Sequence, residues 1–387
     1  MNIKSLLIGS AAALAAVSGA KAADAIVAAE PEPLEYVRVC DAFGTGFFYI
    51  PGTETCLKFG GYVRFQTEFG RDRSGTSDWD SFTRAQFEVD TRTDTELGAL
   101  RGFIGFRGNA DSGVGGATAG TSGNRGSGVF VDQAFIELGG LKVGKFYSWW
   151  DDGLSGEADV LSTNALFNSI RYTYDAGSFW AGISVDELEG TGSQFATQVG
   201  TVTTGAGTFG VFTQEADNNV GITGGIGGNF GGAALQLIGS YDVDQEEGAV
   251  RLIATAEVGP GTLGLAGVWA SGANAYYAES EWAIAAEYAI KATDRLTITP
   301  GGQWFGNVAD RAALGSVVTV NGTPTFVQTG TAIVGNDFSN RDAWQAGITV
   351  DYKITEGLST KVAVNYYDED GGNNDEWNGF VRLQRSF

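Results

Sequence analysis

The chain has 387 residues, of which 59 are glycine and 12% are aromatic, and its formal net charge is −22. This acidity argues against a nucleic-acid partner, because a phosphate backbone is bound through a basic surface. The sequence has no histidine. That removes imidazole as a base, metal ligand or pH switch, weakens most enzyme interpretations, and leads us to expect neither a metal nor a cofactor. The acidity itself has two readings, which are simple solubility and attraction of cations along an internal path.

Residues 1–22 have the pattern of a cleaved export signal. Lys4 gives a short positive region, an apolar run covers residues 6–17, and residues 20–22 (Ala-Lys-Ala) form a small-x-small cleavage site. No later run of 18 apolar residues is present. An exported chain of this kind is either soluble or a β-barrel of an outer membrane.

Residues 23–55 read as an N-terminal lead that contains half of a cysteine pair. Cys40 lies within it and Cys56 follows at its end. In an oxidising compartment an even pair predicts a disulfide, worth about 3 kcal/mol in the loop-entropy model, with two free thiols as the alternative. The bond would hold residues 41–55 beside the first strand.

Residues 56–387 show strand periodicity nearly throughout. Apolar residues such as Leu57, Phe59 and Val63 alternate with polar ones such as Lys58 and Arg64, which predicts a strand with one apolar and one polar face. The pattern repeats to the end of the chain and predicts sixteen strands. They are expected at 57–69, 84–90, 100–107, 133–138, 141–146, 169–174, 178–186, 220–228, 232–242, 249–258, 262–270, 281–291, 296–307, 342–353, 358–367 and 376–387.

The connections between these strands alternate in length. Short connections are expected at 93–98, 139–140, 175–177, 229–231, 259–261, 292–295 and 354–357. Most of the intervening connections are long and rich in Gly, Ser, Thr or Asn, as at 108–128, 147–168, 187–219 and 308–341. Antiparallel strands therefore put short turns at one rim and long loops at the other. With an even strand count, this predicts an all-β fold, a transmembrane antiparallel β-barrel of sixteen strands.

The apolar face of such a barrel must meet lipid, and the polar face must line the lumen. Sixteen strands leave a channel that wall side chains alone do not fill. We expect residues 147–168 to fold inward as a constriction loop, because this loop carries apolar residues such as Trp149 and Trp150 that can anchor it to the wall.

All the charges of this loop are acidic. Between Lys145 and Arg171 the sequence has no basic residue. We therefore predict an acidic pore constriction, with a solvated acidic loop or a surface cation site as the alternative. Its residues are Asp151, Asp152, Glu157 and Asp159.

Basic residues concentrate on the polar faces of the first strands. Facing the acidic loop, they would create a transverse field that orients polar solutes. Local pairing with Glu68, Glu88 and Asp90 in an ordinary lumen network is the alternative. The predicted basic pore wall consists of Lys58, Arg64, Arg84, Arg92, Arg101 and Arg107.

Three stretches carry a family resemblance: residues 23–65, the segment FIELGGLKVGKF at 135–146, and the ending GFVRLQRSF. They resemble the outer-membrane porins of alphaproteobacteria related to Brucella and Rhizobium. The resemblance implies a homotrimer of sixteen-stranded barrels, each with its third loop folded inward, that passes small hydrophilic solutes by diffusion. It also supports pairing of Cys40 with Cys56 and a terminal Phe387 that the barrel assembly machinery reads.

The function that we expect is a general diffusion porin with a mild cation preference. The alternatives are a substrate-selective channel and a structural or adhesive barrel that binds through its surface loops. A lipid-acting barrel enzyme is disfavoured, because a Ser-His pair cannot be built without histidine. The expected partners are outer-membrane lipid and lipopolysaccharide, the assembly machinery, further copies of the chain and small hydrophilic solutes.

Overall fold

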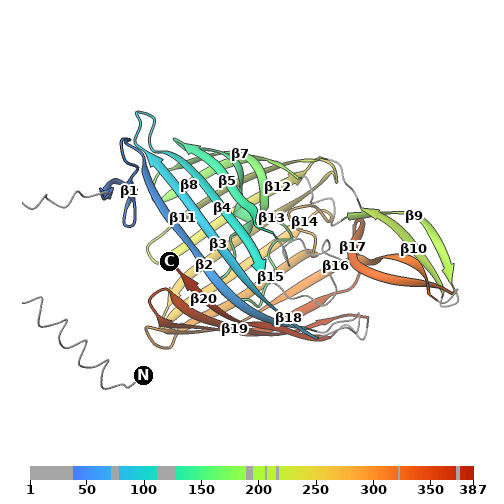
Figure 1. Ribbon diagram of the computed structural model, residues 1–387. Helices are drawn as coiled ribbons and strands as arrows, with labels where there is room; N and C mark the ends of the chain where they lie inside the picture. Colours follow the sequence, from blue (N-terminus) through green and yellow to red (C-terminus); the bar gives the residue numbers. More distant parts are fainter. Residues whose placement is uncertain are drawn as a thin grey trace, which may run out of the picture. The chain divides into compact units, whose positions relative to one another are not determined.

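Antiparallel strands make up nearly all of the structure (Figure 1). The computed structural model describes residues 38–70, 78–110, 128–188, 195–204, 207–214, 218–320, 323–371 and 375–387. Residues Val39–Phe387 form one compact unit. The expected export signal at 1–22, and the lead up to residue 37, lie outside the described residues.

The strands vary widely in length, from two residues to 25. Within the described residues two short 3-10 helices accompany them, η1 (Asp41–Phe43) and η2 (Trp149–Asp151). The strands are β1 (Phe48–Tyr49), β2 (Cys56–Phe69), β3 (Trp79–Thr93), β4 (Leu100–Ala110), β5 (Phe130–Leu138), β6 (Leu141–Tyr147), β7 (Leu166–Asp175), β8 (Phe179–Glu187), β9 (Phe195–Thr204), β10 (Gly207–Gln214), β11 (Val220–Asn229), β12 (Ala233–Asp242), β13 (Glu247–Val258), β14 (Gly261–Ala270), β15 (Ser280–Lys291), β16 (Leu296–Val320), β17 (Thr323–Phe338), β18 (Ala343–Thr355), β19 (Leu358–Glu369) and β20 (Glu376–Ser386).

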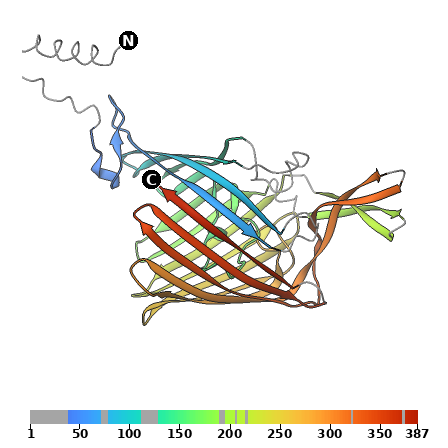
Figure 2. The same ribbon diagram turned by 60° about the horizontal axis from the view of Figure 1, so that its bottom comes forward.

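Sixteen of the strands close into a barrel. They are β2 to β8, β11 to β16 and β18 to β20, each paired antiparallel with the next, and β20 pairs back onto β2 from Tyr62 to Phe69. Figure 2 shows the tilt of these strands. The predicted fold and strand count are therefore confirmed.

The two faces of the barrel wall invert the pattern of a water-soluble protein. On β2, the outward Phe59, Val63 and Phe65 are exposed, whereas the inward Gln66 is buried. This is the arrangement expected where lipid, rather than water, covers the outside. No helix in the described part of the chain is long and apolar enough to cross a membrane.

Two of the predicted long connections contain strands that the sequence analysis missed. The connection at 187–219 holds the hairpin of β9 and β10, and the one at 308–341 holds the distal half of β16 and β17. These strands stand out beyond the end of the barrel (Figure 1). Both stretches are rich in Val, Thr and Phe, so they have strand propensity.

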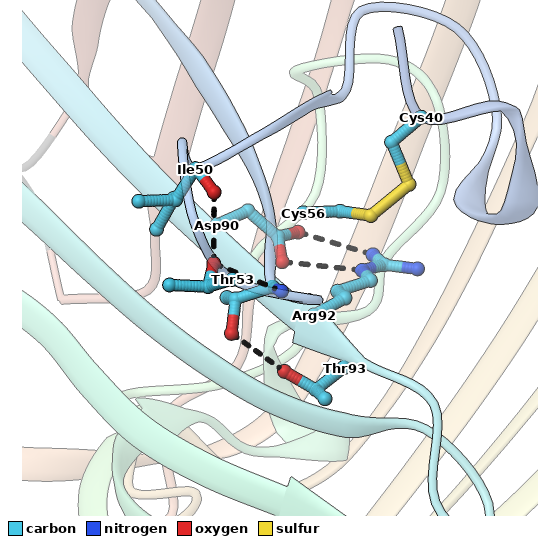
Figure 3. Close-up of a disulfide and its surroundings, with 8 residues drawn as sticks. Cys40, Ile50, Thr53, Cys56, Asp90, Arg92 and Thr93 are labelled. Atoms are coloured by element: carbon cyan, nitrogen blue, oxygen red, sulfur yellow. Dashed lines mark hydrogen bonds and ion pairs between the residues drawn. A yellow bond between two sulfur atoms is a disulfide. The ribbon is translucent and has the colours of Figure 1, made fainter. Parts of the chain in front are cut away.

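A disulfide joins Cys40 to Cys56, as predicted, across a Cα–Cα distance of 6.0 Å (Figure 3). Both cysteines are buried with Phe47. The enclosed segment brings β1 onto β2, where Phe48 and Tyr49 pair with Leu57 and Cys56.

The segment closed by this disulfide covers an edge of β2. β3 pairs with one edge of β2 along its whole length, but β20 reaches only as far as Tyr62 on the other edge. The bonds between Phe387 and Gly61 extend that seam by one residue. β1 occupies the end of the edge that β20 leaves open, beside the short-turn rim.

Candidate functional site

Residues 148–165, between β6 and β7, lie against the inside of the barrel; we call them the inner loop. Its neck is closed by the Ser148 amide, which donates to the Ala165 carbonyl at 2.6 Å. Beyond the neck, the loop bonds to inward side chains of β12, β13, β15, β16, β18 and β19. It therefore runs along much of the inner wall, as an inward-folded loop would.

The first turn of the inner loop is held by a buried arginine of β13. Arg251 is only 1% exposed. Its Nη2 donates to the Trp149 carbonyl at 2.7 Å, and its Nη1 donates to the carbonyls of Trp150 at 2.9 Å and Leu161 at 3.3 Å. These bonds tie both ends of the loop to one guanidinium. They add charged donors to the Trp149 carbonyl, which also accepts from the Asp152 amide, and to the Trp150 carbonyl.

The two tryptophans of the loop pack into the wall. Trp149 stacks on Trp180 of β8 with ring centroids 5.1 Å apart, and Trp150 packs beside Tyr276. Gly182 provides the space, because a Cβ at this position would lie 2.7 Å from the Trp149 ring. The apolar residues therefore anchor the loop.

The middle of the inner loop is bound by amide and carboxylate side chains. Glu287 of β15 accepts from the Ser155 amide at 2.8 Å and from the Gly156 amide at 2.7 Å. Gln303 of β16 exchanges two hydrogen bonds with the backbone of Val160. The wall therefore holds the middle of the loop mainly through its backbone groups.

The four acids of the loop have different surroundings. Asp151 and Asp152 are exposed, and Asp152 accepts from Gln236 of β12 at 2.6 Å. Glu157 makes an ion pair with Lys361 of β19 at 2.9 Å. Two of the four acids therefore keep an open face and one is neutralised by the wall.

Asp159 is the most enclosed of the four. Burial, followed by the nearby Glu287 and Glu157 carboxylates, raises the pKa of Asp159 to about 7. Burial and the adjacent Asp152 also raise the pKa of Asp151. The charge of the loop therefore depends on pH near neutrality.

Part of the predicted basic wall forms a cluster in mid-barrel, which we call the arginine wall. Arg64 and Arg84 are directly opposite each other on β2 and β3. Arg64 donates to Gln384 at 2.8 Å, and Arg84 donates to Asn109 at 3.0 Å. These partners are neutral amides, which orient the guanidinium groups without cancelling their charge.

Two more arginines lie in electrostatic reach of Arg64, namely Arg107 and Arg382. Arg107 pairs with Asp132 at 2.7 Å and donates to the Tyr147 hydroxyl at the start of the inner loop at 3.2 Å. Arg382 of β20 donates to Gln66 at 2.6 Å.

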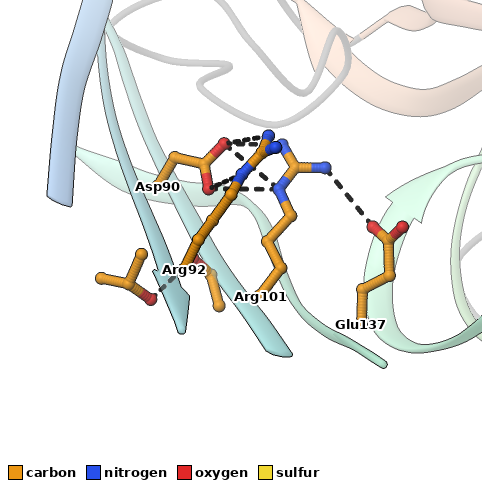
Figure 4. Close-up of polar contacts among 6 residues, drawn as sticks. Asp90, Arg92, Arg101 and Glu137 are labelled. Carbon is orange, nitrogen blue, oxygen red and sulfur yellow. Dashed lines mark hydrogen bonds and ion pairs between the residues drawn. The ribbon is translucent and has the colours of Figure 1, made fainter. Parts of the chain in front are cut away.

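The other three predicted bases lie near the short-turn rim. Arg92 and Arg101 both pair with Asp90, at 3.0 and 2.9 Å, and Arg101 also reaches Glu137 at 3.4 Å (Figure 4). The ammonium of Lys58 lies 5.7 Å from the Phe47 ring centroid. The structure therefore separates the predicted wall into the mid-barrel arginine wall and a locally paired rim group.

Several residues that shape the site were absent from the sequence prediction. Arg382 had a usable signal, because it alternates with apolar residues on the last strand. Arg251 and Glu287 had none, since what distinguishes them is contact with loop residues 90 or more positions away in the sequence. Tyr276, whose hydroxyl donates to Asp186 at 2.8 Å beneath Trp150, is of the same kind.

Two solved structures with a similar fold are an outer membrane protein and an outer-membrane channel. A loop-deletion mutant of OmpT from Vibrio cholerae matches with a TM-score of 0.56 and 14% identity, covering 87% of this chain and 100% of that one. The outer-membrane channel DcaP of Acinetobacter baumannii matches with a TM-score of 0.56 and 13% identity, covering 88% and 99%. At these identities the likeness concerns the fold alone.

Sequence relatives extend over nearly the whole chain. Outer membrane protein IIIA of Rhizobium leguminosarum bv. viciae is 48% identical over 378 residues, covering 96% of this chain and 91% of the relative. Porin Omp2b of Brucella neotomae is 33% identical over 422 residues, covering both chains fully. The family model described as Porin subfamily matches residues 24–382. The chain belongs to the porin subfamily and is an outer-membrane β-barrel.

Proposed function

We propose that this porin is a general diffusion channel for small hydrophilic solutes and ions, with a mild preference for cations. The observation that carries the proposal is the inner loop, whose exposed Asp151 and Asp152 lie inside a barrel that also carries the arginine wall. Charges of opposite sign within one water-filled lumen create a transverse field that acts on solutes in transit. Transit requires no conformational work, because the loop is bound to the wall along its length.

The cation preference is proposed from the balance of these charges. Asp151 and Asp152 are open to solvent, and Asp159 adds charge above neutral pH. Arg107 is partly offset by its ion pair with Asp132. The total charge of −22 acts in the same direction by concentrating cations near the mouths.

The test is single-channel conductance of the refolded protein in a planar bilayer with a salt gradient. Neutralising Asp151 and Asp152 together (D151N/D152N) should shift the reversal potential toward anions. The control is D310N, because Asp310 pairs with Arg341 outside the inner loop. An unchanged reversal potential in the double variant would show that these acids do not line the path. A folded wild-type protein without conductance would refute the channel itself.

Assembly and export complete the proposal. We propose that residues 1–22 are a cleaved export signal, that Phe387 is read by the assembly machinery, and that three barrels associate in lipopolysaccharide-containing membrane. The exposed side chain of Phe387 at the end of β20 agrees with such a signal. Openings in threes, together with a trimer mass after cross-linking, would support the oligomer, whereas only single-step openings and monomer mass would refute it.

One observation favours a second role. β9, β10, β17 and the distal part of β16 project beyond the barrel and are joined by parallel pairing of Ile333 with Phe195. A diffusion channel does not require such a projection, so it is the natural binding surface for an adhesive or structural function. Deleting residues 195–214 should leave conductance intact. Loss of the ability of cells carrying this variant to attach to a surface would support the adhesive role.

A further inference from the structure

A pocket of about 580 Å³ lies on the wall at the short-turn rim, between the β5–β6 turn and the ends of β4 and β7. This volume is within the roughly 300–1,000 Å³ of sites that hold small molecules. Its charged lining consists of Arg101, Glu137, Lys142, Arg171 and Asp175. Neither the inner loop's acids nor the arginine wall contributes to it, so it is separate from the constriction.

Four of these charges lie in one row across the sheet. Arg101 is directly opposite Glu137, Glu137 is opposite Lys142, and Lys142 is opposite Arg171. Residues directly opposite in antiparallel strands share a face, which here is the lumen face. Three bases therefore stand beside a single acid, where an ordinary ladder would alternate in sign.

The acids of the pocket already have partners. Glu137 pairs with Arg101 at 3.4 Å (Figure 4). Asp175 accepts from the Gly177 amide of its own turn at 2.7 Å. Neither acid forms an ion pair with Lys142 or Arg171 within the described part of the chain.

Lys142 and Arg171 therefore form no ion pair with a described carboxylate, although Glu137 acts electrostatically on Lys142, and Asp186 and Asp152 act on Arg171. Lys142 Nζ makes no hydrogen bond or ion pair to any described residue. Arg171 is 7% exposed, its Nη2 donates to the Tyr147 carbonyl at 3.3 Å, and its buried Nε has no hydrogen-bond partner in the described structure. A buried donor left unpaired costs free energy, and it shows that the protein does not satisfy all the donors of this guanidinium.

Aromatic rings hold both cations in place. The Lys142 ammonium lies 3.9 Å from the ring centroid of Phe135 and 4.5 Å from that of Phe146. The Arg171 guanidinium lies 4.7 Å from the Phe146 ring and 4.1 Å from the Trp149 ring. Ring faces attract a cation without neutralising it, so the two charges are fixed in position and remain available.

We propose that this pocket binds an oxyanion, the carboxylate or phosphate group of a small solute, on the short-turn side of the channel. Guanidinium and ammonium groups held side by side are the arrangement that binds such groups. The inference rests on channel activity but not on the cation preference. An anionic solute that passes the acidic loop would meet an attractive site at the short-turn rim, the end that faces the periplasm in barrels of this kind.

Inorganic phosphate is the probe. Single channels are recorded in chloride at constant ionic strength while phosphate is added to one chamber and then to the other. We expect wild-type conductance to fall at about tenfold lower phosphate from one side, which is the short-turn side. In K142Q/R171Q this half-effect concentration should rise about tenfold, which corresponds to about 1.4 kcal/mol.

The matched control is K291Q. Lys291 is another rim cation, but it is exposed and pairs with Glu257 at 3.2 Å. K142R/R171K keeps both charges and should retain most of the phosphate effect. It is the variant to measure if K142Q/R171Q does not fold. A purely structural role for the pair would lower thermal stability in K142Q/R171Q and leave the phosphate effect unchanged.

Each remaining outcome also decides the question. Equal phosphate effects from both chambers, or an effect reduced equally by K291Q and K142Q/R171Q, would overturn the site. Normal conductance without any phosphate effect would overturn the site but not the channel. Absence of conductance in folded protein would overturn the channel itself, so the two failures are distinguishable.

Discussion

The inner wall of this barrel has two parts that are built differently. On β2, β3 and β20, long side chains such as Arg64, Arg84 and Arg382 are held by neutral amides and keep their charge. On β8 and β11 to β16, inward glycines leave room for the inner loop, and neighbouring inward side chains such as Arg251 and Glu287 bond to its backbone. Gly264, for example, faces Leu154 where a Cβ would come within 2.9 Å. The arginine-bearing part contributes positive charge to the lumen. The other part, which we call the loop seat, is the section of wall on β8 and β11 to β16 that contacts the inner loop.

Replacing Arg251 by methionine should have the largest effect, because it removes the main link between the loop and its seat. Three carbonyls lose charged donors, and we expect the free energy of unfolding to fall by about 4 kcal/mol. Single-channel current should become noisy, because the first turn of the inner loop is no longer held against the wall. Urea unfolding and current noise are the measurements, with R295M on an exposed turn as the control. A quiet channel in R251M would mean that the wall seats the loop without this residue.

Removing the disulfide tests the charged part, whose rim it braces. The free energy of unfolding of C40S/C56S should be about 3 kcal/mol lower, because the unfolded chain gains conformational entropy when the disulfide no longer closes the loop. Conductance should stay nearly unchanged, because both cysteines lie beside the rim and away from the inner loop. Unfolding of oxidised wild type and the double variant gives the first value, and bilayer recording gives the second. A large conductance change would show that the brace also shapes the lumen.

Adding one methyl group at Gly182 should disturb the packing of the inner loop on the wall without removing a hydrogen bond. In G182A the new Cβ would lie 2.7 Å from the Trp149 ring and 2.7 Å from the Tyr172 carbonyl. We expect a loss of about 2 kcal/mol from this overpacking, with a change in tryptophan fluorescence. G224A on the adjacent strand is the control, because its nearest neighbour would be 3.9 Å away. Equal stability of the two variants would contradict the close fit.

The smallest effect concerns pH. Because the pKa of Asp159 is raised to about 7, the folded protein holds this proton where the unfolded chain has lost it. The contribution of Asp159 to stability is therefore greatest below the unfolded pKa and declines as pH rises to about 7. Over the same range the loop gains negative charge, and cation preference should increase. Reversal potentials between about pH 5.5 and 8.5 test this, and an equally steep curve in D159N would assign the titration elsewhere.

The alternating pattern of the sequence was sufficient to predict the barrel, but not to predict which wall residues contact the inner loop. Parity along β2 places Phe59 outside and Arg64 inside, whatever the rest of the chain does. The same parity gives no reason for Gly182 or Arg251, whose partners are on the inner loop. The pairing of β9 with β17 likewise could not be predicted from the sequence, because it joins segments more than 100 residues apart.

The short pairing of β1 with Leu57 and Cys56 bears on how the barrel is made. A first strand that waits for the last one exposes a free edge, and free edges join wrong strands. Cys40 and Cys56 are both at the N-terminal side of that strand, so they can oxidise before β20 arrives. The bond then folds a few residues over the end of the edge. β1 therefore masks the start of the closing edge of β2, and the stretch from Tyr62 to Phe69 is left for β20.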